Sequence, residues 1–293
     1  MGWGEVFALS SALIWALAVI LMRRSGETLP AFELNLFKNC FGLVLLIPTI
    51  LLVDGLVLPY YTLPELSLVL ISGLLGIAIA DTWYLTALNM MGASRTGIVS
   101  SLFSPFVIFL SAIFLGERLV PWQWLGFILV MAGVLLVTWR AHRSSVDKER
   151  LKKGLLYAVG AVFMMAVGIV MVKEILETRS FLWTMGLRFV GGIAGMLAFL
   201  LIGERWLNAK RNFSQPQPWG TILLASFLGA YLALILWLAG YKLIDASVAS
   251  ILNETNVVFI VFLAWLMLGE HINRRKLVGM GLTVGGVIIM MLV

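Results

Sequence analysis

The chain has 293 residues, of which 61% are hydrophobic and 12% are charged, and its formal net charge at pH 7 is +6. With a mean hydropathy of +1.01, this much apolar surface cannot be hidden inside one soluble core, so we expect the protein to lie in a bilayer. The basic residues stand in short loops, which is typical of membrane proteins and argues against nucleic-acid binding. The single cysteine, Cys40, excludes an intramolecular disulfide and a cysteine metal cluster.

Ten apolar segments follow one another along the chain, and each is close to the roughly 20 residues that a helix needs to cross the hydrocarbon core. They leave no room for a soluble domain. The first segment lacks a basic stretch before it and a small-residue cleavage site after it, so we interpret it as a mature helix. The segments are 3–22, 32–53, 66–88, 97–115, 122–139, 154–172, 181–202, 219–241, 247–268 and 277–293.

The second half of the chain repeats the first. Residues 83–139 and 236–292 align at a constant offset of 153 without a gap, and the front parts match at an offset of 150, which pairs Lys38 with Arg188. The pattern predicts two five-helix repeats, at 1–139 and 154–293, joined by a basic linker loop at 140–153. Because five is odd, the repeats insert in opposite orientations, an arrangement found in transporters whose substrate site lies between the two halves.

The loop charges predict an orientation. The linker and the loops on its side of the membrane hold 15 Lys and Arg, and the opposite side holds four, Arg118, Lys173, Arg179 and Lys242. The positive-inside rule therefore places the linker in the cytoplasm and both termini outside.

Two turns carry the same motif. Leu115-Gly116-Glu117 and Leu268-Gly269-Glu270 each follow an apolar segment, where glycine is a common helix stop, and each precedes a helix with glycines seven residues apart. With this duplicated motif, the chain resembles the ten-helix EamA-type transporters of the drug/metabolite transporter superfamily. The resemblance also includes Trp15 in the first segment, a basic residue in the second and seventh segments, and Pro105 in the fourth. One departure is Val258, which stands where the first half has Pro105, so the two halves need not bend alike.

The resemblance implies a fold and a function. It implies an all-α membrane protein in which ten transmembrane helices form two inverted repeats around a central cavity. Helices 1, 3, 4, 6, 8 and 9 are then expected to line that cavity, and export is the expected direction of transport.

Asp81, Glu254, Lys38 and Arg188 are ionisable residues that lie well inside predicted spans or near their ends. A charge at a helix centre costs roughly 2.5–3.5 kcal/mol on insertion scales, so each needs a partner or a water-filled cavity. Glu254 can pair with Arg188 or Lys38, or Lys38 can reach the membrane surface. Alternatively, the two acids bind substrate or protons, because burial disfavours a charged carboxyl and lets it exchange a proton near neutral pH. Neither acid is repeated in the other half, because Asp81 corresponds to Leu234 and Glu254 corresponds to Ser101. We expect the protein to fold when Asp81 is neutralised, and transport or its pH dependence to be impaired.

Small polar residues follow one face of the fourth and ninth segments. Ser250, Asn253 and Glu254 lie at helical spacing, and the corresponding stripe of the first half includes Ser101. Such residues often only help helices pack, but two stripes in inverted halves are typical of facing cavity walls. Aromatic side chains can add to these walls, although most tryptophans mark span ends and anchor at the interface. Aromatic candidates for the cavity are Trp15, Tyr84, Tyr231 and Trp237.

We therefore predict a secondary transporter in the inner (cytoplasmic) membrane that moves a small metabolite such as an amino acid. Hydrophobic or quaternary-ammonium cations are an alternative substrate class, and a non-transporting membrane receptor is an alternative of another kind. No nucleotide-binding loop, zinc-protease helix or serine-nucleophile motif occurs in the sequence, so we expect neither enzymatic activity nor a cofactor. The expected partners are a small-molecule substrate, the bilayer and protons, and the expected state is a monomer or weak homodimer.

Overall fold

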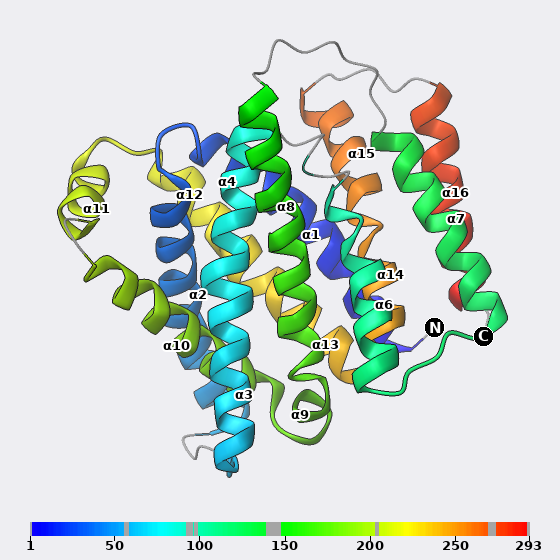
Figure 1. Cartoon of the computed structure of the whole chain (residues 1–293), viewed down its shortest axis with the longest axis horizontal. Coiled ribbons are helices and arrows are strands. Elements are labelled where there is room, and N and C mark those ends of the chain that lie inside the picture. The colour runs from blue at the N-terminus through cyan, green and yellow to red at the C-terminus, as the bar shows by residue number, and fades with distance from the viewer. Residues whose placement is uncertain are drawn as a thin grey trace.

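The structure, a computed structural model, describes residues 2–55, 59–91, 96, 99–138, 148–202, 205–268 and 274–291. These residues form helices and turns and contain no strand. Outside them lie residues 140–147 of the predicted linker and residues 269–270 of the second Leu-Gly-Glu turn. In Figure 1, α1 begins at the end of the bundle where the two termini lie, whereas α8 begins at the opposite end, so these first helices of the two halves run in opposite directions.

The helices lie close to the predicted segments. In the first half they are α1 (Trp3–Ser25), α2 (Ala31–Val53), α3 (Leu63–Gly73), the π-helix η1 (Leu74–Ala80), α4 (Asp81–Met91), α6 (Phe103–Phe114) and α7 (Pro121–Thr138). In the second half they are α8 (Lys148–Val170), α9 (Lys173–Thr178), α10 (Phe181–Leu200), α11 (Arg205–Ser214), α12 (Trp219–Ser226), the π-helix η2 (Phe227–Ala233), α13 (Leu234–Leu243), α14 (Ala246–Asn253), α15 (Asn256–Leu268) and α16 (Arg274–Met291).

Six helical segments are long and apolar enough to cross a membrane among the described residues: Trp3–Ser25, Ala31–Val53, Leu63–Met91, Glu149–Val170, Phe181–Leu200 and Trp219–Leu243. Four shorter apolar helices follow the remaining predicted segments, Phe103–Phe114, Pro121–Leu136, Ala246–Ile260 and Leu277–Ile289. Two short helices lie outside the predicted spans: α9, and α11, a basic helix that buries only Ala209. α8 follows a predicted span but begins earlier, at Lys148, inside the expected linker loop.

Local polar groups set where several helices begin. Thr62 and Glu65 form a reciprocal capping box before α3, in which the Thr62 hydroxyl accepts a hydrogen bond from the Glu65 N–H and the Glu65 carboxylate accepts one from the Thr62 N–H at 2.7 Å. The Ser180 hydroxyl accepts a hydrogen bond from the N–H of Trp183 and caps α10 in the same way. These caps fix the entry points of two membrane-spanning helices.

The third and eighth spans each contain a π-helical segment at the same place. η1 covers 74–80 and η2 covers 227–233, which is the repeat offset of 153 residues. π-helical turns are rare and occur frequently at functional sites. Their exact duplication makes them a property of the repeat unit.

The fourth and ninth spans are interrupted at equivalent positions. The chain turns at Ser101-Leu102 before α6 and at Glu254-Thr255 between α14 and α15, again 153 residues apart. The backbone hydrogen bonds also correspond: the Leu102 N–H donates to the Val99 carbonyl at 3.0 Å, and the Thr255 N–H donates to the Leu252 carbonyl at 3.2 Å. The replacement of Pro105 by Val258 left it open whether the halves bend alike; the structure shows that both helices break at the same place, before the proline position.

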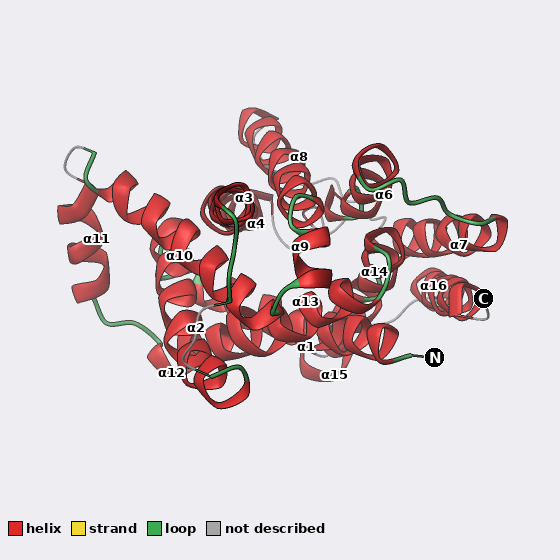
Figure 2. Ribbon diagram, turned by 90° about the horizontal axis from the view of Figure 1, so that it is seen from below, coloured by secondary structure: helices red, strands yellow, loops and turns green. Residues whose placement is uncertain are grey.

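The last helix of each half packs against its counterpart at one edge of the bundle (Figure 2), where α7 and α16 lie side by side. A Cβ atom at Gly133 would lie 2.4 Å from the Thr283 hydroxyl, and one at Gly286 would lie 2.7 Å from the Gly126 carbonyl. These glycines permit close contact between the last helices of the two halves. A Cβ atom at Gly281 or Gly285 of α16 would meet open space.

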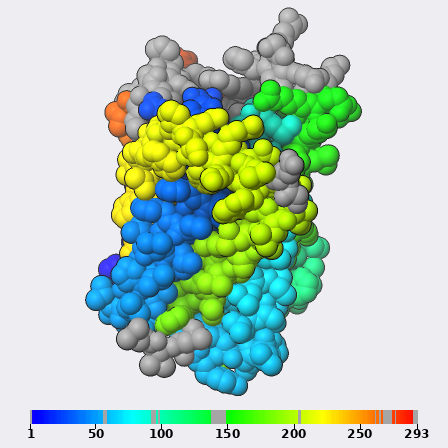
Figure 3. All heavy atoms as spheres, turned by 90° about the vertical axis from the view of Figure 1, so that its left-hand side faces the viewer, coloured from blue at the N-terminus to red at the C-terminus, as the bar shows by residue number. Residues whose placement is uncertain are grey.

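The outside of the bundle is apolar. Figure 3 shows the face formed by α2 and α10, with α11 above them. Exposed side chains on these two helices include Val44, Ile47, Val190 and Leu197. An apolar exterior of this kind is expected where helices face lipid.

Candidate functional site

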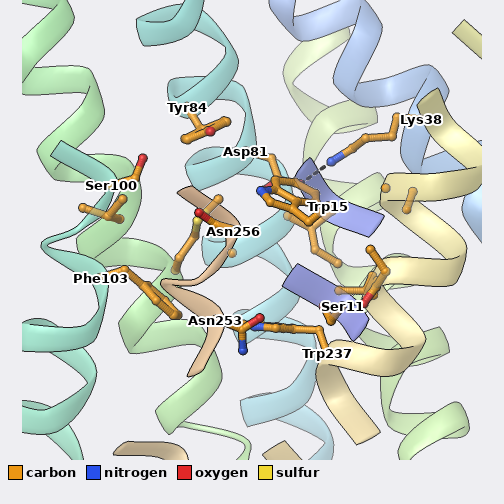
Figure 4. Close-up of a pocket in the computed structure, with 18 of the residues that line it drawn as sticks. Ser11, Trp15, Lys38, Asp81, Tyr84, Ser100, Phe103, Trp237, Asn253 and Asn256 are labelled. Atoms are coloured by element: carbon orange, nitrogen blue, oxygen red, sulfur yellow. Dashed lines mark hydrogen bonds and ion pairs between the residues drawn. The ribbon is translucent and has the colours of Figure 1, made fainter. Parts of the chain in front are cut away.

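A cavity lies at the centre of the bundle, between the two halves. Its volume is about 170 Å³, many times the roughly 10–15 Å³ that one water molecule needs on the same measure. Its walls come from the first, third, fourth, sixth, eighth and ninth spans, and also from α2 and α10 through Lys38, Asn39 and Arg188. Figure 4 shows side chains from several of these helices converging on this space.

Glu254 lies at the break of the ninth span and lines the cavity. Its side chain is buried, and its Oε1 accepts a hydrogen bond of 2.9 Å from the hydroxyl of Ser104 on α6. Among the described residues it forms no ion pair, so the suggested pairing with Arg188 or Lys38 is not present. The contact joins the two interrupted helices, and with it the two halves of the molecule.

Lys38 and Asp81 form the ion pair of the cavity. The Lys38 ammonium on α2 lies 2.5 Å from Oδ2 of Asp81, at the start of α4 (Figure 4), and the side chains are 4% and 16% exposed. The idea that Lys38 reaches the membrane surface is therefore wrong. Because the pair is largely buried, removal of either charge leaves the other without compensation. The ion pair therefore replaces the expectation that folding tolerates neutralisation of Asp81 with the prediction that it lowers stability.

Arg188 on α10 also lines the cavity but has a different environment. Its Nη1 donates hydrogen bonds to the Ser72 hydroxyl at 3.1 Å and to the Gly168 carbonyl at 2.8 Å. Its backbone is in direct contact with α3, since a Cβ atom at Gly73 would lie 2.0 Å from the Arg188 carbonyl oxygen. The guanidinium is held in place by two neutral partners, and it forms no ion pair within the part of the chain that the structure describes.

Aromatic side chains supply the apolar walls. Trp15 of α1 and Tyr84 of α4 have ring centroids 6.4 Å apart, and Phe103 of α6 and Trp237 of α13 have centroids 6.5 Å apart. All four line the cavity. Tyr231, in contrast, is not among the lining residues, and its hydroxyl pairs with Thr49 at 2.6 Å.

The structure brings most of the predicted site residues together. The lining includes Trp15, Lys38, Asp81, Tyr84, Arg188, Trp237, Asn253 and Glu254. Ser250 and Ser101 are not part of it: both are buried, and the Ser250 hydroxyl donates to the Ser247 carbonyl.

Four polar or aromatic lining residues were not predicted to face the cavity. They are Ser11, Asn39, Phe103 and Asn256. Ser100, which also lines the cavity, belongs to the polar stripe predicted for the fourth segment. Asn39 and Asn256 carried a usable signal, because each is an amide within an apolar run and lies within two residues of a predicted charge. Ser11 and Phe103 carried none, since serine and phenylalanine are common throughout such helices.

Glu117 fixes the helix that leads to Glu254. Its carboxylate accepts hydrogen bonds from the backbone N–H groups of Ala246 and Ser247, both at 2.9 Å, and from the Ser247 hydroxyl at 2.7 Å. These groups form the N-terminus of α14, where a negative charge is favoured by the unpaired N–H donors and the helix dipole. The Leu-Gly-Glu turn of the first half thus anchors a cavity helix of the second half.

No metal centre accompanies this arrangement: the described residues contain no group of three or more His, Cys, Asp or Glu side chains placed to hold a metal ion.

Comparison with known proteins agrees with the duplicated architecture. A sequence profile of the EamA-like transporter family matches residues 2–139 and 152–292. The chain is 27% identical over 285 residues to the uncharacterized transporter YdfC of Bacillus subtilis, a match that covers 94% of this chain and 86% of the relative. It is 25% identical over 279 residues to the pseudopaline exporter CntI of Pseudomonas aeruginosa, covering 94% and 91% of the two chains.

A solved crystal structure has the same fold. It superimposes with a TM-score of 0.76 over 99% of this chain and 98% of the other, at 19% sequence identity.

Proposed function

Because the chain belongs to the EamA-like transporter family, we propose that it is a secondary transporter that carries a small metabolite, such as an amino acid, through the central cavity by alternating access. That it is a membrane transporter follows from the family and from the apolar helices. The family and the names of its relatives point to transport rather than catalysis. The substrate, the export direction and the coupling are our proposal.

One observation carries this proposal: a buried carboxyl without an ion-pair partner among the described residues, Glu254, lines the cavity at the break of a helix. Discontinuous helices that meet near the membrane midplane form the substrate sites of many secondary transporters, because broken helices expose polar backbone groups to a cavity. Its only side-chain partner in the described structure, the Ser104 hydroxyl, is neutral and can be exchanged for a substrate donor or a proton. Glu254 therefore serves as the proton- or substrate-binding group.

The other charges of the cavity favour an amino acid over a lone cation. Besides Glu254 and Asp81, the lining contains Lys38 and Arg188, so the ionised site is balanced in charge. A quaternary-ammonium ion would add an uncompensated positive charge there, whereas a zwitterion adds none. The aromatic walls suit an apolar side chain on either ligand.

The test is transport by the purified protein in liposomes. We expect counterflow of at least one radiolabelled amino acid, and we expect Glu254→Gln to abolish it or its pH dependence. Glu174→Gln is the matched control, because Glu174 lies exposed on α9, outside the cavity. Binding without counterflow would instead identify a non-transporting receptor, and counterflow of quaternary amines alone would identify the alternative substrate class.

We further propose that the linker side faces the cytoplasm of the inner membrane and that 140–153 separates two like domains, 1–139 and 154–293. The orientation rests on the loop charges. In a chain with Cys40 replaced by serine, a cysteine at Gln215, beyond α11 on the linker side, should resist an impermeant maleimide in intact cells. A cysteine at Thr178, exposed on α9 at the other end, should react. The reverse pattern would overturn the orientation.

A further inference from the structure

The two halves treat their corresponding basic residues differently. Lys38 and Arg188 occupy equivalent positions of the repeat, and both line the cavity. In the first half Asp81 neutralises Lys38 at 2.5 Å. In the second half the residue equivalent to Asp81 is Leu234, which also lines the cavity, so the acid that would neutralise Arg188 is replaced by an apolar side chain.

Arg188 is consequently a buried cation that forms no ion pair among the described residues; Asp81, the acid that acts on it through space, is already paired with Lys38. The Arg188 side chain is 4% exposed, and among the described residues only Nη1 donates hydrogen bonds, to Ser72 and Gly168. A guanidinium carries five N–H donors in a planar fork, so most of its donors are left for another group. A buried charge outside an ion pair is costly, and Arg188 lies at the wall of a cavity of about 170 Å³.

The position of the guanidinium is fixed in advance. The close backbone contact at Gly73 sets α10 against α3, and a Cβ atom at Gly76 would lie 3.1 Å from Arg188 Nη2. The missing side chain at Gly76, itself a lining residue, thus leaves room for the fork beside the cavity. Donors held in this way lose little freedom when they bind an anion.

We infer that Arg188 is the specificity-determining residue that binds a carboxylate of the transported molecule, so that only substrates with a free carboxylate are accepted. This inference rests on the proposed function and names the substrate class of the same cavity. Planar, bidentate pairing with carboxylate is the interaction for which a guanidinium is best suited. Lys38 does not compete for this role because Asp81 already occupies its ammonium. Glu254, at the break of the ninth span, then accepts the substrate ammonium in place of the Ser104 hydroxyl.

The experiment compares each of the twenty L-amino acids with its own α-carboxamide, which keeps the ammonium and the side chain but removes the negative charge. Binding is measured by the thermal shift of detergent-purified protein, and transport by counterflow in liposomes. For the amino acids that bind, the wild-type protein should prefer the acid over the amide at least tenfold. Arg188→Gln should reduce this ratio to about twofold or less. Arg179→Gln should leave the ratio unchanged, because Arg179 pairs with Glu65 outside the cavity.

Two further variants guard against misfolding of Arg188→Gln. Arg188→Lys retains the charge but not the fork, and Gly76→Ala places a methyl group against Nη2, so both should lower the acid-to-amide ratio without removing the cation. An equal affinity of the wild-type protein for acids and amides would overturn the inference, and so would an unchanged ratio in all three variants. Counterflow of amides or amines alone overturns the inference but leaves the transporter function standing. A complete lack of counterflow with acids, amides and quaternary amines would overturn the proposed function as well.

Discussion

Neutralising Glu254 separates a binding role from a structural one. In Glu254→Gln the side chain keeps its shape and an oxygen that can accept the 2.9 Å hydrogen bond from Ser104. A hydrogen bond to a charged group contributes about 1.5–3 kcal/mol and a neutral one about 0.5–1.5 kcal/mol, so the bond weakens by about 1 kcal/mol. The substitution also removes a buried charge that no described residue pairs with, which offsets that loss.

We therefore expect the free energy of unfolding to change by less than about 1 kcal/mol, which corresponds to a Tm shift of no more than roughly 2–4 °C for a protein of this size. If Glu254 neutralised a buried cation, the same change would cost about 3–5 kcal/mol. The measurements are the Tm in detergent and liposome transport at two pH values. Transport or its pH dependence should fall while the Tm holds.

Ser104→Ala is the matched control, since it removes the hydrogen-bond donor but leaves the carboxyl. It should destabilise the protein more than Glu254→Gln does, by about 1–3 kcal/mol, because a buried acceptor is then left without a partner. A large loss of stability in Glu254→Gln, recovered by also neutralising Arg188, would refute the reasoning and make Glu254 a structural residue.

Substitutions of three other acidic residues test the ion pair of the cavity and the start of α14. Asp81→Asn should lower the free energy of unfolding by about 3–5 kcal/mol, because it leaves the buried Lys38 ammonium uncompensated. Lys38→Met combined with Asp81→Leu should restore most of the Tm. Equal Tm values for Asp81→Asn and the wild type would contradict the ion pair. Glu117→Ala removes the acceptor of three hydrogen bonds at the start of α14 and should cost about 2 kcal/mol, whereas an unchanged Tm would show that this anchor is dispensable. Asp245→Asn should preserve or raise the Tm at pH 7. Burial, and then the Glu117 carboxylate, raises the pKa of Asp245 above 3.8, so its charged form weakens the folded state at neutral pH; the gain should shrink as the pH falls toward 4.

The membrane-spanning helices were predictable because their signal is local. An apolar run of sufficient length identifies a span without reference to any other part of the chain. The repeat predicted how the halves are arranged, because two similar sequences that are offset by five helices insert in opposite orientations. The start of α8 at Lys148 was not predicted, because a charged helical turn and a charged loop have the same composition.

The partners of the charges were not predictable in the same way. From the sequence, we suggested that Glu254 pairs with Arg188 or Lys38, or that Lys38 reaches the membrane surface. In the structure, Lys38 instead pairs with Asp81, and Glu254 accepts a hydrogen bond from Ser104. These contacts join residues 43 and 150 positions apart. They depend on how neighbouring helices are rotated against each other, and apolar periodicity within a uniformly apolar helix does not encode that rotation.

The π-helical segments give the third and eighth spans a built-in rotation. In η1 the N–H of Asp81 bonds to the carbonyl of Gly76, five residues earlier, so these two cavity residues share one face of the helix. An α-turn holds 3.6 residues, so one additional residue advances everything after it by about 100°. Because of this rotation, one continuous helix places Gly73 against α10 and also directs Asp81 toward Lys38. Deleting one residue from 74–80 would leave a continuous helix in which the residues after the deletion are rotated away from their present faces. The number of residues in this segment is therefore as tightly constrained as the identity of any of its side chains.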